Sequence, residues 1–170
     1  DPLKKPRLVG GGAQGARRLN ELGAEGTEST AWQVLHLAGQ ADFERLSGQV
    51  GKRDGYKVLA FCENMAAAYA ASDFCVARSG ASSLTELSHA GLPALLVPFP
   101  YAADDHQTAN ARVFEKAGAA VLTQERDLEA KTITDMLAEL NEGHLESMSD
   151  SMRDLADPDA ATQIANVIEG

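Results

Sequence analysis

Short apolar segments alternate with longer segments of helical periodicity along most of this 170-residue chain. This alternation is typical of a parallel sheet whose strands are joined by crossover helices. The expected strands lie at residues 7–10, 32–37, 56–61, 74–77, 93–97 and 120–122. We therefore predict an α/β fold with a Rossmann-like, doubly wound parallel sheet of about six strands, in a single domain over residues 1–170.

Helical patterns follow most of these strands and continue beyond the last one. They begin near Gln14, Asp42, Met65, Ser82 and Asp104, and glycines at Gly91 and Gly118 are expected to end two of them. Apolar spacing predicts two further helices around residues 133–140 and 145–155, and Pro158 precedes a short one at 159–168. Residues 21–30 contain two glycines and one large apolar residue, which predicts that the first helix is short or frayed.

Charge and cysteine content exclude several classes of function. The net charge of −10 repels nucleic acid and anionic lipid, so we expect no nucleic-acid partner. The sequence contains no apolar run of membrane-spanning length and begins with DPLKKPR, which predicts a cytoplasmic protein. Cys62 and Cys75 form no C-x-x-C pair, and we expect both to be packing residues.

A glycine-rich turn follows the first expected strand. Gly10, Gly12 and Gly15 satisfy the G-x-G-x-x-G pattern where a strand passes into a helix. Such a turn lets backbone N–H groups approach a diphosphate at a helix N-terminus, although a tight turn that binds nothing remains the alternative. A dinucleotide site would need an acidic residue at the end of the second strand, and that strand ends at His36 followed by Leu-Ala-Gly. We expect His36 to be a hydrogen-bonded packing residue.

A second turn of small residues follows the fourth expected strand. Residues 79–83 open a helix that ends at Gly91, and their N–H groups can hold a phosphate or a sugar. Glu86 lies about one turn inside this helix, where a carboxylate can accept hydrogen bonds from both ribose hydroxyls. The alternative is a helix N-terminal acid that favours the dipole or forms a capping box with Ser83.

A third polar segment, VPFPYAADDHQTANAR, follows the fifth expected strand. Its first helical turn should open toward the same edge of the sheet, and Gln107 either binds sugar hydroxyls or is simply exposed. Asp104, Asp105 and His106 suggest a metal site, but adjacent helical side chains diverge, so we expect no metal.

Four segments resemble, in the right order, the C-terminal donor-binding domain of the GT-B enzymes of glycosyltransferase family 28 that transfer GlcNAc to lipid I. The segments are GGAQGARRLN, AFCENMAAAYAASD, ARSGASSLTELSHAGLPALLVPFPYAADDHQTANA and GAAVL. The resemblance implies an inverting N-acetylglucosaminyltransferase, without metal or other cofactor, that moves GlcNAc from UDP-GlcNAc to undecaprenyl-diphosphoryl-MurNAc-pentapeptide in peptidoglycan synthesis. It also implies a location at the inner face of the cell membrane.

The resemblance also implies roles for individual residues. Glu86 would bind the ribose, Gln107 the GlcNAc hydroxyls, and the Cys62 backbone the uracil. The implied UDP-sugar-binding set is Gly12, Ala13, Gln14, Cys62, Ala81, Ser82, Ser83, Leu84, Thr85, Glu86 and Gln107. Arg78, Gly80, His106 and Asn110 would support these loops.

The chain departs from the family pattern and leaves other classes open. Ala13 stands where relatives usually have serine, which removes one hydroxyl near the diphosphate, and Ser82 and Ser83 replace a common Leu-Thr pair. The acceptor site, the membrane contact and the general base are expected in an N-terminal domain that this sequence lacks, so the chain alone should be inactive. The alternatives are a stand-alone nucleotide-binding or partner module, another UDP-sugar GT-B enzyme, or a UDP-sugar epimerase.

Overall fold

A computed structural model describes residues 6–10 and 16–156, with the backbone alone described at 6–9. Its centre is a six-stranded sheet in which every neighbouring pair is parallel. The order across the sheet is β3-β2-β1-β4-β5-β6, which confirms the predicted doubly wound topology. The strands are β1 (Pro6–Gly10), β2 (Gln33–Leu37), β3 (Tyr56–Leu59), β4 (Cys75–Ala77), β5 (Ala94–Leu96) and β6 (Ala120–Leu122).

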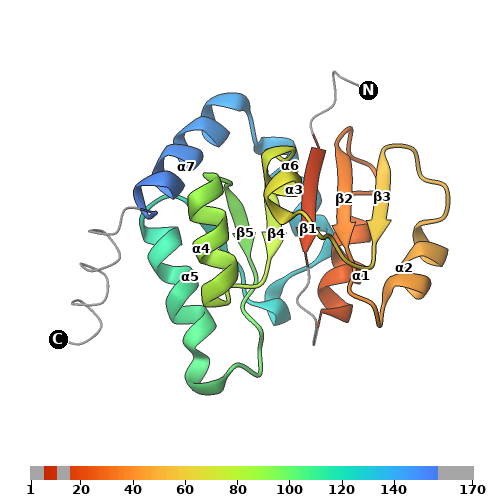
Figure 1. Ribbon diagram of the computed structural model, residues 1–170, viewed down its shortest axis with the longest axis horizontal. Helices are drawn as coiled ribbons and strands as arrows, with labels where there is room; N and C mark the ends of the chain where they lie inside the picture. Colours follow the sequence, from red (N-terminus) through yellow and green to blue (C-terminus); the bar gives the residue numbers. More distant parts are fainter. Residues whose placement is uncertain (1–5, 11–15, 157–170) are drawn as a thin grey trace.

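Helices connect these strands and cover the sheet (Figure 1). They are α1 (Arg17–Gly26), α2 (Phe43–Val50), α3 (Met65–Ala70), α4 (Ala81–Ala90), α5 (His106–Lys116), α6 (Ala130–Glu139) and α7 (Glu142–Asp154), with short 3₁₀ turns η1 (Ala103–Asp105) and η2 (Glu125–Asp127). The predicted helix at 159–168 lies outside the described residues. Within 6–10 and 16–156, none of the helices has both the length and the apolar character needed to cross a bilayer.

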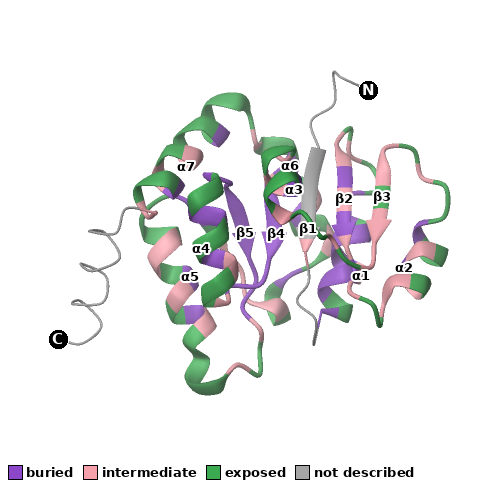
Figure 2. Cartoon of the chain, viewed as in Figure 1, coloured by how far each residue is buried: buried purple, intermediate pink, exposed green. Residues whose placement is uncertain are grey.

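The two faces of the sheet carry separate hydrophobic cores because successive residues of a strand point to opposite sides. Cys75 and Ala77 of β4 pack with α3, α4 and α5 on one face, whereas Val76 between them packs with α1 and α6 on the other. β5 alternates in the same way. Figure 2 shows β4 and β5 buried along their length, as expected for parallel strands covered on both faces.

The first helix is continuous, contrary to the prediction of a short or frayed element. α1 runs for ten residues and buries Gly23 and Gly26. A Cβ atom added at Gly26 would lie 2.7 Å from the Ala130 carbonyl oxygen and 2.7 Å from Cβ of Ile133. The glycine therefore permits close contact between α1 and α6, and the Thr134 hydroxyl donates to the Gly26 carbonyl at 2.8 Å. Packing against α6 overrides the weak helix propensity of this stretch.

Glycine ends α4 as predicted. Gly91 adopts the left-handed conformation, with φ 61° and ψ 34°, and its N–H bonds to carbonyls in the last turn of α4. The chain then enters β5 within three residues, so the opposite end of α4 is held at the carboxyl edge of the sheet.

Candidate functional site

At one position in the sheet, the connections that leave two neighbouring strands run in opposite directions. β1 and β4 are neighbours at the middle of the sheet, with Val9 beside Val76. From β1 the chain continues toward β2 and β3, and from β4 it continues toward β5 and β6. The two connections diverge at the carboxyl ends of these strands, which is the position where ligands bind in open α/β sheets.

Both turns that the sequence singled out follow these two strands. Gly12, Ala13 and Gln14 of the first turn lie outside the described residues. At Gly10, the last described residue before that turn, an added Cβ atom would meet no described atom within 4 Å. The second turn, which occupies residues 78–80 between β4 and α4 in the structure, is fully described.

The second turn leads into the N-terminus of α4 without a capping side chain among the described residues. Gly80 is the N-cap, in an extended conformation with φ −67° and ψ 149°. The Leu84 N–H donates to the Gly80 carbonyl at 3.0 Å, so the N–H groups of residues 81–83 precede the first intrahelical donor. Ala81 and Ser82 are exposed. This helix end can therefore receive an anion such as a phosphate.

Leu84 differs from the rest of the expected donor-binding run. Its side chain is 4% exposed and lies in the core with Leu87, and its N–H is used within the helix. The Leu84 side chain therefore anchors α4 on the sheet, and its place in the donor-binding run stays a prediction. Thr85 is exposed, and its hydroxyl donates to the Ala81 carbonyl at 3.0 Å.

Glu86 is exposed and faces α3. Its Oε2 accepts a hydrogen bond from the Tyr69 hydroxyl at 2.8 Å, in place of the capping-box contact with Ser83 that was the alternative. The two residues line an apolar groove of about 460 Å³ between α3 and α4, together with Met65, Thr85 and His89. Burial first, and then the hydrogen bond to Glu86, raise the pKa of Tyr69, so its hydroxyl remains a donor at neutral pH.

Gln107 ties the start of α5 to the second turn. Its Oε1 accepts from the Phe99 N–H at 2.9 Å, and its main-chain carbonyl accepts from the Ser79 hydroxyl at 2.8 Å. A Cβ atom added at Gly80 would lie 3.8 Å from Nε2 of Gln107. The amide nitrogen therefore lies close to the N-terminus of α4.

Arg78 and Asn110 connect the loops around the second turn. The Asn110 amide donates to the Ser79 carbonyl at 3.4 Å. Arg78 is buried, donates to the carbonyls of Val97 and Pro98 at 3.2 Å each, and pairs with Glu125 at 2.5 Å. Its guanidinium also lies 5.6 Å from the centre of the Phe99 ring. Arg78 thus holds the segment after β5 against the turn after β4.

The start of α5 has an unusual backbone. Asp104 and Asp105 both have positive φ, 50° and 52°, which is uncommon outside glycine. The Thr108 hydroxyl donates to Asp105 at 2.6 Å, and Nδ1 of the exposed His106 donates to the Ala103 carbonyl at 2.6 Å. In the described part of the chain, no three His, Cys, Asp or Glu side chains are placed to share a metal ion.

The cysteines and His36 occupy packing positions. Cys62 lies half-buried in the connection from β3 to α3 and packs on the core, while burial raises the pKa of the Cys75 thiol to about 12. His36 is fully buried, and its ring accepts from the Tyr56 hydroxyl at 2.6 Å and donates to Asn20 at 3.0 Å. This confirms the expected hydrogen-bonded packing role of His36.

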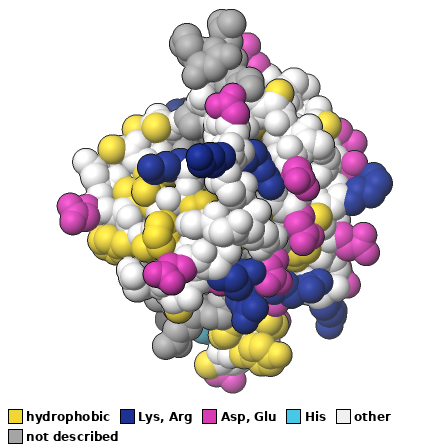
Figure 3. All heavy atoms as spheres, turned by 90° about the vertical axis from the view of Figure 1, so that its right-hand side faces the viewer, with side chains coloured by type: hydrophobic (Ala, Val, Ile, Leu, Met, Phe, Trp, Pro, Cys, Tyr) yellow, Lys and Arg dark blue, Asp and Glu magenta, His cyan; other side chains and the backbone are white. Residues whose placement is uncertain are grey.

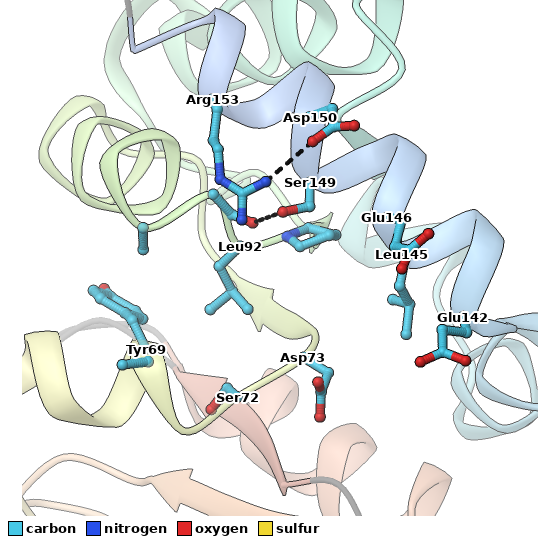
Figure 4. A pocket seen from close by; sticks show the side chains of 14 residues that line it. Tyr69, Ser72, Asp73, Leu92, Glu142, Leu145, Glu146, Ser149, Asp150 and Arg153 are labelled. Atoms are coloured by element: carbon cyan, nitrogen blue, oxygen red, sulfur yellow. Dashed lines mark hydrogen bonds and ion pairs between the residues drawn. The ribbon is translucent and has the colours of Figure 1, made fainter.

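A larger hollow lies at the opposite edge of the sheet (Figure 4). It has a volume of about 510 Å³ between α7 and the segments that precede β4 and β5. Its charged side chains include Asp73, Glu146, Asp150 and Arg153, and Arg153 pairs with Asp150 at 3.1 Å. None of the expected donor-binding residues lines it, so its size does not make it the nucleotide site.

The face that includes β3 and α2 shows how charge is distributed on that side. Acidic and basic side chains lie interspersed there (Figure 3). Arg45, for example, contacts both Asp42 at 2.6 Å and Glu21 at 3.1 Å. A surface that binds a nucleic-acid backbone needs basic side chains that are free to contact phosphates. Arg45 is instead paired with carboxylates of the same chain.

Sequence reasoning missed Tyr69 because MAAAYAA has the pattern of an ordinary helix that packs close to a sheet. The signal available was a single large polar side chain in a run of alanines, in the helix directly before the fourth strand. Its relation to Glu86 depends on how α3 and α4 pack, which the sequence does not state.

Solved structures that match this chain include glycosyltransferases. The chain matches the crystal structure of Acinetobacter baumannii MurG with a TM-score of 0.84 and 31% identity, over 99% of this chain and 52% of that one. It matches the glycosyltransferase VinC in complex with dTDP with a TM-score of 0.71 and 19% identity, over 97% and 42%, a likeness of fold alone. The chain therefore has the fold of one half of a GT-B glycosyltransferase.

The family follows from sequence. Residues 8–164 match the sequence model described as Glycosyltransferase family 28 C-terminal domain, and the chain belongs to that family. Two relatives carry the name "UDP-N-acetylglucosamine--N-acetylmuramyl-(pentapeptide) pyrophosphoryl-undecaprenol N-acetylglucosamine transferase". The relative from Halorhodospira halophila is 44% identical over 95% of this chain, and the one from Thiobacillus denitrificans is 40% identical over 95%. The chain spans about half the length of these relatives, 47% and 46%.

Proposed function

We propose that this chain is the donor-binding domain of an inverting N-acetylglucosaminyltransferase. The full enzyme would transfer GlcNAc from UDP-GlcNAc to undecaprenyl-diphosphoryl-MurNAc-pentapeptide, converting lipid I to lipid II in peptidoglycan synthesis. Family membership and the names of relatives at 40–44% identity support this reaction. The observation that carries the proposal is the uncapped N-terminus of α4 at the switch point, with Glu86 one turn further along the helix.

The chemistry of such a domain is stabilisation of the leaving group. Negative charge grows on the UDP phosphate as the glycosidic bond breaks, and fixed N–H donors at a helix N-terminus oppose that charge without reorganisation. The N–H groups of residues 81–83 would contact the diphosphate, together with the glycine turn after β1. Glu86 would accept hydrogen bonds from the ribose. The Gln107 amide nitrogen, which faces Gly80, would donate to an oxygen of the sugar.

The remaining parts of the reaction belong to the other half of the full-length enzyme. That half would bind the lipid acceptor, supply the general base and make the peripheral contact with the inner face of the membrane. We propose that the donor site works without a metal or other cofactor, because helix N-termini can neutralise the diphosphate. The domain alone would bind the donor and leave the transfer step to the complete enzyme.

Calorimetry of the 170-residue chain with UDP, UDP-GlcNAc, UDP-glucose and NAD tests the proposal. We expect UDP and UDP-GlcNAc to bind and NAD not to bind. Loss of the hydrogen bonds between Glu86 and the ribose should remove about 1.5–3 kcal/mol of binding free energy. Glu86→Ala should therefore weaken UDP binding about ten- to a hundred-fold.

The matched control is Glu115→Ala, which removes an exposed glutamate from the last turn of α5, at the opposite end of that helix from Gln107. It should leave UDP affinity unchanged. Equal or stronger binding of NAD would overturn the proposal. Failure of the chain to bind any of these nucleotides would favour a partner module that lacks a donor site.

A further inference from the structure

The α3–α4 groove contains a contact that links an element outside the two turns to the proposed ribose carboxylate. Tyr69 comes from α3 and Glu86 from α4, 17 residues apart, and their side chains meet at 2.8 Å. The two helices pack against each other on the same face of the sheet. α3 therefore contributes to the environment of Glu86 even though it contributes no residue to either turn.

The two partners differ in how firmly each is held. The Tyr69 ring is half-buried and packs against the core formed by α4 and the sheet, which leaves its hydroxyl in a fixed place. Glu86 is exposed, and a free glutamate on a helix surface samples several rotamers. A fixed donor that binds one carboxylate oxygen restricts those rotamers and leaves the second oxygen available.

The other polar side chains of the groove hydrogen-bond to the helix backbone. The Thr85 hydroxyl donates to the Ala81 carbonyl at 3.0 Å, and Nδ1 of His89 donates to the Thr85 carbonyl at 2.8 Å. Both side chains therefore turn to α4 itself. Tyr69 is the groove residue whose hydroxyl reaches the Glu86 carboxylate.

We propose that Tyr69 is a positioning residue that orients Glu86 for the ribose of a uridine nucleotide. This inference rests on the proposed function, because it assumes that Glu86 receives the ribose hydroxyls. Tyr69 itself does not touch the nucleotide. It lowers the conformational entropy that Glu86 would otherwise lose on binding, and preorganisation of one side chain is worth roughly a three- to ten-fold change in affinity.

The test replaces Tyr69 by phenylalanine in the 170-residue chain and measures binding of UDP and of 2′-deoxy-UDP by calorimetry. Tyr69→Phe keeps the ring and its packing and removes only the hydroxyl. We expect UDP binding to weaken about three- to ten-fold and the preference for UDP over 2′-deoxy-UDP to shrink, with an unchanged melting temperature. In a Glu86→Ala background the same substitution should have no further effect on UDP affinity.

Tyr56→Phe is the matched control, because it also removes a tyrosine hydroxyl that makes a hydrogen bond, here to His36. It should lower the melting temperature and leave the ribose preference unchanged. Unchanged UDP affinity in Tyr69→Phe, tighter binding, or an equal loss in the Glu86→Ala background would each overturn the inference. Failure of the unmodified chain to bind UDP would instead remove the proposed function, and the inference with it.

Discussion

Acidification should destabilise this domain through one buried histidine. The His36 ring is 0% exposed and sits between the Tyr56 hydroxyl at 2.6 Å and Oδ1 of Asn20 at 3.0 Å. Asn20 itself donates to the Ala38 carbonyl and to Asp42. The ring nitrogens are thus satisfied in the neutral form, in which Nδ1 accepts and Nε2 donates. A second proton would convert Nδ1 into a donor, so it could no longer accept the hydrogen bond from the Tyr56 hydroxyl.

The direction of the effect follows from the pKa. Burial lowers the pKa of His36 from 6.5 to about 4, and the charge of Asp42 offsets only part of this. Between these two values the unfolded chain binds more protons than the folded chain, so stability decreases as pH decreases. The stability that neutral His36 contributes is fully present above the pKa of the unfolded chain and is lost as pH falls toward the pKa of the folded chain. The shift of about 2.5 units corresponds to roughly 3 kcal/mol.

The measurement is urea unfolding of the unmodified chain and of His36→Gln between about pH 7 and about pH 4.5. Glutamine keeps one donor and one acceptor and does not titrate, and the carboxylates titrate alike in both proteins. We expect the unmodified chain to lose about 2–3 kcal/mol more than the variant over this interval. Parallel pH profiles for the two proteins would refute the reasoning, since they would show that His36 binds protons equally in the folded and unfolded states.

Two further predictions concern packing and loop support, and urea unfolding measures both. Gly26→Ala should lower the free energy of unfolding by about 1–3 kcal/mol, because its Cβ atom would lie 2.7 Å from two atoms of α6. Gly48 is exposed within α2, and an added Cβ atom there would meet no described atom within 4 Å. Gly48→Ala should therefore raise the free energy of unfolding by about 0.5–1 kcal/mol. Equal effects of the two substitutions would contradict the packing argument. Glu125→Gln should cost about 1.5–3 kcal/mol by weakening the contact with the buried Arg78, and a neutral result would mean that the Val97 and Pro98 carbonyls hold Arg78 unaided.

The strands and helices were predictable because their signals are local. Each observed strand falls within the predicted range or one residue beyond it, and Gly91 ends α4 as expected. The failures were also local in origin. The glycines at 23 and 26 suggested a short or frayed helix, and the burial of the Leu84 side chain was not predicted. In each case a distant element, α6 or the sheet, decides the outcome.

The candidate site was predictable only in part. Sequence patterns located the second turn, Glu86 and Gln107, but not how these residues relate to one another. The structure places the Gln107 amide close to Gly80 and the Glu86 carboxylate against the Tyr69 hydroxyl. The residue types suggested phosphate and sugar chemistry, whereas the direction of each side chain depends on which helices pack together.

The sequence by itself determined where strands and helices form and that the chain belongs to an α/β class, because hydrophobic periodicity reflects the geometry of a single element. Only the tertiary structure decided that β1 and β4 are neighbours, although 64 residues separate the end of one, Gly10, from the start of the other, Cys75. That pairing creates the switch point and places the carboxyl ends of β1 and β4 side by side at one edge of the sheet. The physical reason is that strand order depends on how the helices cover both faces, a long-range property that no local pattern records.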